Sequence, residues 1–210
     1  MKKLLIFIGA ILVVLFSSCS SCNKSNEASD TTKTKGIVVE NTISAAKEYM
    51  FLNYGEDYRW FESCVTMTNF MDGDSTSSEI ENVTNIFQVV EMAEDSCNAD
   101  VHVITISNNK SNPEAKVEVI EGFWIEDYVL NTEEINVTFE EAYERAMNAN
   151  ITKPHSRQCV LRKEVGPVEC NAQYIFGNSQ CQIYVDAVTG EVSGINPAYG
   201  RFGMPLGEWP

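Results

Sequence analysis

The sequence has few basic residues, and this scarcity excludes a broad class of partners. Lysine and arginine number 15 against 30 aspartates and glutamates, which gives a formal net charge of −15 at pH 7. Nucleic-acid binding needs clustered lysine and arginine against the phosphates, and docking on anionic lipid needs a basic patch. We therefore expect a solvated acidic surface and no nucleic-acid partner.

Residues that hold metals or perform catalysis are also sparse. The two histidines are His102 and His155, and no His-Glu-x-x-His motif is present. Zinc-ligand spacing is absent, because the one C-x-x-C pair is formed by Cys19 and Cys22. No nucleophile is spaced with a base and an orienting group. We predict that the protein is not an enzyme and uses no metal or cofactor.

Long apolar runs are missing apart from one near the start, Leu4 to Phe16. A membrane-spanning helix needs about 20 apolar residues, so this run is too short to cross a bilayer. It follows Met1-Lys2-Lys3 and precedes Ser17-Ser18-Cys19. A basic start, an apolar stretch and small residues at a processing site are typical of an export signal.

Because the apolar stretch ends on a cysteine, the segment resembles the signal peptide of a bacterial lipoprotein. The resemblance implies that Cys19 becomes the lipid-bearing first residue and attaches the chain to a membrane of the cell envelope, the outer membrane by expectation. An ordinary secretory signal is the alternative. Residues 20–36 are small and polar, and we expect a flexible tether there. Without Lys2 and Lys3, the remainder has a net charge of −17.

Two stretches of the chain predict the same order of elements. Apolar spacing predicts a helix that is capped by Thr42 and ends at Gly55. Alternation predicts a strand from Arg59 to Phe70, with Phe61, Val65 and Met67 on one face. Further strands are predicted at 83–92, 99–107 and 115–121. In the second stretch, Thr138 and Glu141 form a capping box that opens a helix, and strands are predicted at 158–165, 172–176 and 182–187.

This repeated order suggests an internal duplication, in which Cys64-Val65 corresponds to Cys159-Val160. If Cys19 carries lipid, six of the seven cysteines remain. An exported chain with an even number of cysteines is expected to form disulfides. The duplication favours Cys64–Cys97 and Cys159–Cys170, whereas Cys170–Cys181 is the local competitor. Cys22 has no obvious partner.

The second half resembles a known domain family. Thr138-Phe139-Glu140-Glu141-Ala142 resembles the opening helix of a PepSY domain. The stretch Tyr184-Val185-Asp186-Ala187-Val188-Thr189-Gly190-Glu191-Val192 resembles the closing strand and turn of that domain. In that turn Asp186 and Thr189 are expected to bond local backbone, and Gly190 permits a positive φ.

The first half is similar to the wider cystatin-like layout, in which one helix packs on an antiparallel sheet. Tandem modules of this kind resemble the propeptides of thermolysin-type metalloproteases, which chaperone and inhibit an attached catalytic domain. This resemblance implies a binding module that restrains an extracytoplasmic protease. A structural or assembly lipoprotein of the envelope, with no protease partner, is the alternative.

We therefore predict an α+β protein of two tandem small modules, each with one helix packed on an antiparallel sheet. The predicted segments are a lipoprotein signal peptide (1–19), a tether (20–36), a cystatin-like module (37–130), a PepSY-like module (131–196) and a tail rich in glycine, proline and aromatic residues (197–210). The tail is expected to pack on the sheets or to bind a partner.

Overall fold

The computed structural model describes residues 36–73, 78–92, 99–124, 128–164, 169–178 and 181–195. The predicted signal peptide with Cys19, Cys22 in the tether, Cys97 and the tail lie outside these residues. The described residues form an α+β fold, which confirms the predicted fold class. Its elements are α1 (Val39–Tyr54), β1 (Tyr58–Met67), β2 (Ile80–Met92), β3 (Ala99–Asn109), β4 (Asn112–Glu121), the 3-10 helix η1 (Thr132–Glu134), α2 (Phe139–Asn148), β5 (Gln158–Arg162), β6 (Gln173–Gly177), β7 (Gln182–Asp186) and β8 (Val192–Ile195).

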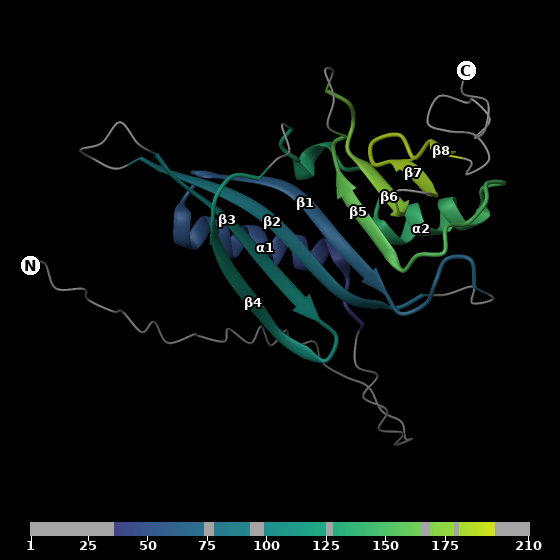
Figure 1. The fold of residues 1–210 in the computed structure, drawn as a ribbon, viewed down its shortest axis with the longest axis horizontal. Helices are drawn as coiled ribbons and strands as arrows, with labels where there is room; N and C mark the ends of the chain where they lie inside the picture. The colour runs from purple at the N-terminus through teal and green to yellow at the C-terminus, as the bar shows by residue number, and fades with distance from the viewer. Residues whose placement is uncertain are drawn as a thin grey trace, which may run out of the picture. The chain divides into compact units, whose positions relative to one another are not determined.

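All eight strands belong to one antiparallel sheet with the order β4-β3-β2-β1-β5-β6-β7-β8 (Figure 1). Each half of the chain contributes four consecutive strands, and the halves join where β1 pairs with β5. The chain therefore repeats the order of one helix and four strands, but the strands build a single sheet.

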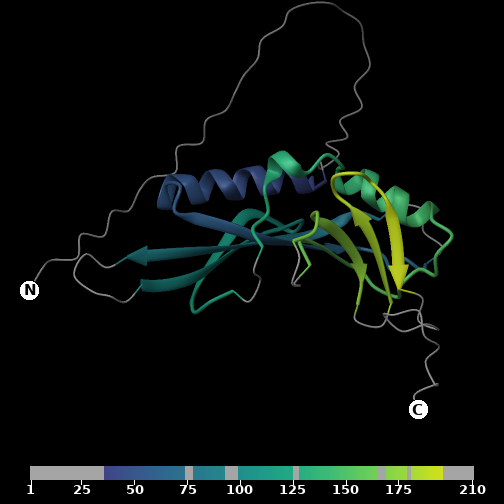
Figure 2. The same cartoon turned by 90° about the horizontal axis from the view of Figure 1, so that it is seen from above.

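Both helices pack on the same face of this sheet, as the turned view shows (Figure 2). In α1 the buried residues Val39, Ile43, Ala46 and Met50 recur at helical spacing, so they form one apolar stripe. These residues and the apolar residues of α2 belong to one buried core cluster. The two halves therefore share a core as well as a sheet.

The starts of the two helices are tied together. The predicted capping box is confirmed, since Thr138 Oγ1 accepts from the Glu141 N–H and the Glu141 carboxylate accepts from the Thr138 N–H. In addition, Glu40 of α1 accepts a hydrogen bond of 2.7 Å from the Phe139 N–H in the first turn of α2. This hydrogen bond links α1 to α2. The helix dipole strengthens it, because a negative charge is favourable at the start of a helix.

Two local predictions were wrong. Helix α1 begins at Val39, and Thr42 lies inside its first turn, where the hydroxyl bonds the Val39 carbonyl. In β1 a bulge between Trp60 and Glu62 adds one residue to the strand. Phe61 is buried but lies outside the core cluster that holds Val65 and Met67. Simple alternation therefore assigned Phe61 to the wrong face.

Two neighbouring positions of α1 test the shared core. Met50 is fully buried and Leu52 is 75% exposed. We expect Met50→Ala to lower the free energy of unfolding by about 2–5 kcal/mol, because it removes packed methylene groups and leaves a cavity. Leu52→Ala should change it by about 0.5 kcal/mol or less. Urea unfolding followed by circular dichroism measures both; equal effects would contradict the assigned burial.

Candidate binding surface

The sheet face opposite the helices, here called the open face, is a surface that both halves build together. The strand registers align one row of side chains across it, namely Lys116, Ser107, Thr84, Cys64, Val160, Ile175, Tyr184 and Ser193. A neighbouring row contains Glu118, Thr105, Ile86, Glu62, Arg162, Gln173 and Asp186. Each row therefore runs through the junction of β1 with β5 and draws on both halves.

The open face carries charges of both signs that nearly cancel, although the chain is strongly acidic. Basic Arg59, Lys116 and Arg162 stand on it together with acidic Glu62, Glu118 and Asp186. Most of its polar side chains are hydroxyls and amides, which include Thr66, Asn82, Thr84, Thr105, Ser107, Gln158, Gln173 and Gln182. Val160 and Tyr184 are half-buried among them. The centres of protein interfaces are depleted in charged residues and enriched in tyrosine. The middle of the first row, from Thr84 to Tyr184, has this composition and fits a protein-binding surface.

The charges near the centre of the open face are paired. Glu62 is buried, and its carboxylate lies 3.7 Å from the Arg162 guanidinium. The Cys64 thiol donates to Glu62 at 2.8 Å. Burial, reinforced by the Glu62 charge, raises the pKa of Cys64 well above its usual range. Cys64 therefore stays a protonated thiol at neutral pH and is a poor nucleophile.

The turn after β7 has the local contacts that its residue types favour. The Asp186 carboxylate accepts from the Val188 and Thr189 N–H groups, each at 2.8 Å, and Thr189 Oγ1 accepts from the Glu191 N–H. Burial acts to raise the pKa of Asp186, but hydrogen bonds from Thr189, Asn171, Val188 and Gln173 lower it overall.

Gly190 connects this turn to helix α2. It has φ of 75°, and its carbonyl accepts a 3.1 Å hydrogen bond from Arg145. A Cβ at this position would lie 2.5 Å from the Arg145 guanidinium. The turn motif of Asp186, Thr189 and Gly190 is thus occupied by contacts within the chain, which gives it a structural role.

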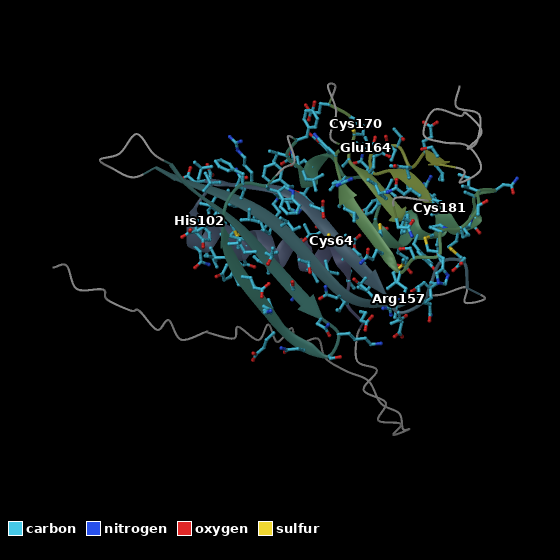
Figure 3. All side chains as sticks on the ribbon, viewed as in Figure 1. Cys64, His102, Arg157, Glu164, Cys170 and Cys181 are labelled. Carbon is cyan, nitrogen blue, oxygen red and sulfur yellow. The ribbon has the colours of Figure 1, made fainter. Side chains whose placement is uncertain are left out.

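The second-half disulfide predictions do not match the structure, in which Cys64, Cys159, Cys170 and Cys181 are free thiols. Cys159 is fully buried and pairs with Phe176 across the ladder, so no cysteine stands opposite it. Figure 3 shows Cys170 and Cys181 at separate places on the second half. Neither Cys159–Cys170 nor Cys170–Cys181 is formed. The partner predicted for Cys64, Cys97, lies outside the described residues.

The register also shows that Cys64 and Cys159 are not equivalent positions. Cys64 pairs with Val160, and Val65 pairs with Cys159. Val65 and Cys159 belong to the helix-side core, whereas Cys64 lies on the open face. A shift of one residue reverses the face of every side chain in a strand. The matched cysteines of the proposed duplication therefore differ by such a shift.

The histidines occupy separate sites. His102 in β3 stands opposite Val89 and Glu121. His155 lies before β5, where its Nδ1 is 2.9 Å from the Asp72 carboxylate and its ring stacks on Phe70 with centroids 4.1 Å apart. The sequence gives no signal for this exposed histidine–aspartate pair, because its members are 83 residues apart.

A shallow pocket of about 350 Å³ lies beside the end of α1. Lys47 Nζ donates to Thr132 Oγ1 at 2.8 Å and lies 5.8 Å from the centre of the Trp60 ring. Burial lowers the pKa of Lys47, and the charge of Glu133 opposes this shift. Because the Lys47 amine already contacts η1 and Trp60, we take the open face, and not this pocket, as the candidate binding surface. The pocket is lined by Lys47, Phe51, Glu56, Tyr58, Trp60, Val129 and Leu130.

No protein-family model, curated protein or solved structure matches this chain. Among the described residues, no three His, Cys, Asp or Glu side chains gather where they could hold a metal ion. Within the same ranges, no helix has both the length and the apolar character needed to cross a membrane. We therefore infer function from the sequence pattern and from the open face.

The environments of the cysteines predict an order of thiol reactivity. Cys170 and Cys181 are half-buried, whereas Cys159 is fully buried. Burial is the main cause that raises the pKa of Cys159. In native protein without reductant, we expect a thiol reagent to modify Cys170 and Cys181 well before Cys159, which should react only on unfolding. Peptide mass spectrometry identifies the modified sites. Cys170 that reacts only after reduction would indicate a disulfide and contradict the structure.

Proposed function

We propose that this chain is an exported, lipid-anchored binding protein that holds an extracytoplasmic protein partner on its open face, and that the partner is a protease whose activity it restrains. The carrying observation is that basic and acidic residues nearly balance on the open face, in a chain of net charge −15. An ordinary solvated face of so acidic a protein is expected to carry many carboxylates. A face with little net charge, built by both halves, is suited to contact another protein.

The shape and support of this face favour binding without large rearrangement. It is carried by eight hydrogen-bonded strands, and the shared core packs against their other side. Side chains on such a scaffold are held in place before the partner arrives, so little conformational entropy is lost on binding. Tyr184, with its hydroxyl 2.6 Å from Gln182, is one such positioned side chain.

The finer fold assignment is also part of this proposal. We infer that residues 37–130 and 131–196 are related modules, cystatin-like and PepSY-like respectively. The repeated order of one helix followed by four strands supports this relation. The capping box at Thr138 and the bonded turn from Asp186 to Gly190 support the PepSY-like assignment. Inhibitory propeptides built from such modules supply the protease hypothesis.

The lipid anchor is tested by paired cysteine substitutions near the start of the chain. We expect Cys19→Ser to abolish incorporation of a labelled fatty acid and to release the protein from the membrane fraction. Cys22→Ser, three residues further on, is the matched control and should remain lipidated. Loss of the label in Cys22→Ser alone would assign the modification to Cys22, and a wild-type chain that takes up no label would reject lipidation.

The binding surface is tested by removing one tyrosine from each side of the fold. Tyr184 lies on the open face, whereas Tyr49 is exposed on α1. We expect Tyr184→Ala to weaken inhibition of the target protease about tenfold or more, because aromatic residues dominate interface energies. Tyr49→Ala should leave inhibition unchanged.

Inhibition constants are measured with envelope proteases from the same cell, and unfolding curves verify that both variants fold. A wild-type chain that neither binds nor slows any of these proteases would reject protease restraint. Equal inhibition by Tyr184→Ala and the wild-type chain would reject the open face as the site.

A further inference from the structure

We propose that two copies of this chain associate edge to edge through β4, in an antiparallel pairing centred on Val117. This pairing is independent of the protein that the open face binds. It begins from the position of β4, which pairs with β3 on one side and ends the sheet on the other. Edge strands present unpaired backbone groups that can template another strand.

The exposed side chains of β4 include both charged and apolar residues. Val119 and Ile120 are 55% and 56% exposed, although they are adjacent in an edge strand of ten residues. Natural edges are commonly guarded by charges and proline, and β4 carries Pro113, Glu114, Lys116, Glu118 and Glu121. Such charges oppose pairing with most strands, but a strand that sets the opposite charges against them is favoured.

The hydrogen-bond pattern identifies which residues of β4 face outward. The Gly122 N–H donates to the Val101 carbonyl at 3.0 Å. In an antiparallel ladder this direction alternates, so Glu118 and Ile120 also direct their backbone groups toward β3. The outward N–H and C=O groups then belong to the intervening residues. Those that supply donors and acceptors for a second copy are Ala115, Val117 and Val119.

The outward groups match themselves under a two-fold axis at Val117. An antiparallel copy places Val117 opposite its own equivalent and Ala115 opposite Val119, and all of these positions are outward-facing. The same alignment places Lys116 of each copy opposite Glu118 of the other, so two such pairs form, one on either side of the axis. Opposite charges in directly facing positions stabilise strand pairs, whereas like charges destabilise them.

Neighbouring registers are less favourable. An axis at Ala115 pairs Lys116 with Glu114, but it brings Pro113, which has no N–H, opposite Val117 near the centre of the pairing. The axis at Val117 leaves Pro113 at the end of the pairing, opposite Glu121. An axis at Val119 places Glu118 opposite Ile120 and loses both Lys–Glu pairs. Within one copy, Lys116 and Glu118 already contact each other at 2.5 Å, and both remain largely exposed. Both side chains are therefore available to a second copy without any change in the core.

Charge reversal tests the pairing in trans. In sedimentation velocity of the purified full chain in detergent, we expect the wild type to show a concentration-dependent dimer. Lys116→Glu and Glu118→Lys should each raise the dimer dissociation constant about tenfold or more, since two attractive pairs become repulsive. An equimolar mixture of the two variants should restore the dimer, because both glutamates of one variant then face both lysines of the other across the interface.

Contacts within one chain cannot explain restoration by mixing, so this outcome is specific to the pairing. Glu48→Lys makes the same charge change as Glu118→Lys on the exposed side of α1 and should leave the dimer unchanged. Val117→Pro removes an outward N–H without a bond to β3 and should abolish the dimer. A wild type that stays monomeric throughout the concentration series, or a dimer unaffected by these β4 changes, would overturn the proposal.

Discussion

The pairing of β1 with β5 is the contact on which the rest of the structure depends. It aligns Ser63 with Leu161, Cys64 with Val160, Val65 with Cys159 and Thr66 with Gln158. Without it, each half would expose the backbone edge of its first strand and one side of its apolar core. With it, the edges are paired and the two helices cover a common core. A sheet of eight strands also buries a larger fraction of its apolar surface than two small sheets can.

This junction also explains why the open face is a candidate site. A side-chain row that crosses β1 and β5 is contiguous only because the registers of both halves meet there. Cys64 and Tyr184 are 120 residues apart in the chain, yet they belong to one row on one face. The balance of charges on that face could not be seen in the overall composition, since acidic residues elsewhere dominate the count.

Local signals predicted much of the fold. The capping box at Thr138, the apolar stripe of α1 and the strand alternation located both helices and seven of the strands. The short strand β8 and the bulge at Phe61 were missed, because neither has a strong periodic pattern. The union of both halves in one sheet was also missed. Long-range strand pairing depends on edges that meet in space, which local periodicity does not encode.

The polar pair beneath α1 shows why a buried core can still require specific contacts. Ser63 and Asn85 are fully buried on adjacent strands, and the Ser63 hydroxyl donates to Asn85 at 2.5 Å. The Asn85 amide donates to the Thr42 carbonyl of α1 at 3.5 Å. Apolar packing alone tolerates sliding of a helix along a sheet, but sliding here would leave buried polar groups unpaired at a cost of about 1–3 kcal/mol each. The pair therefore fixes α1 to the strands of its own half, while the β1–β5 ladder fixes the two halves to each other. These two constraints together hold the rows of the open face in register.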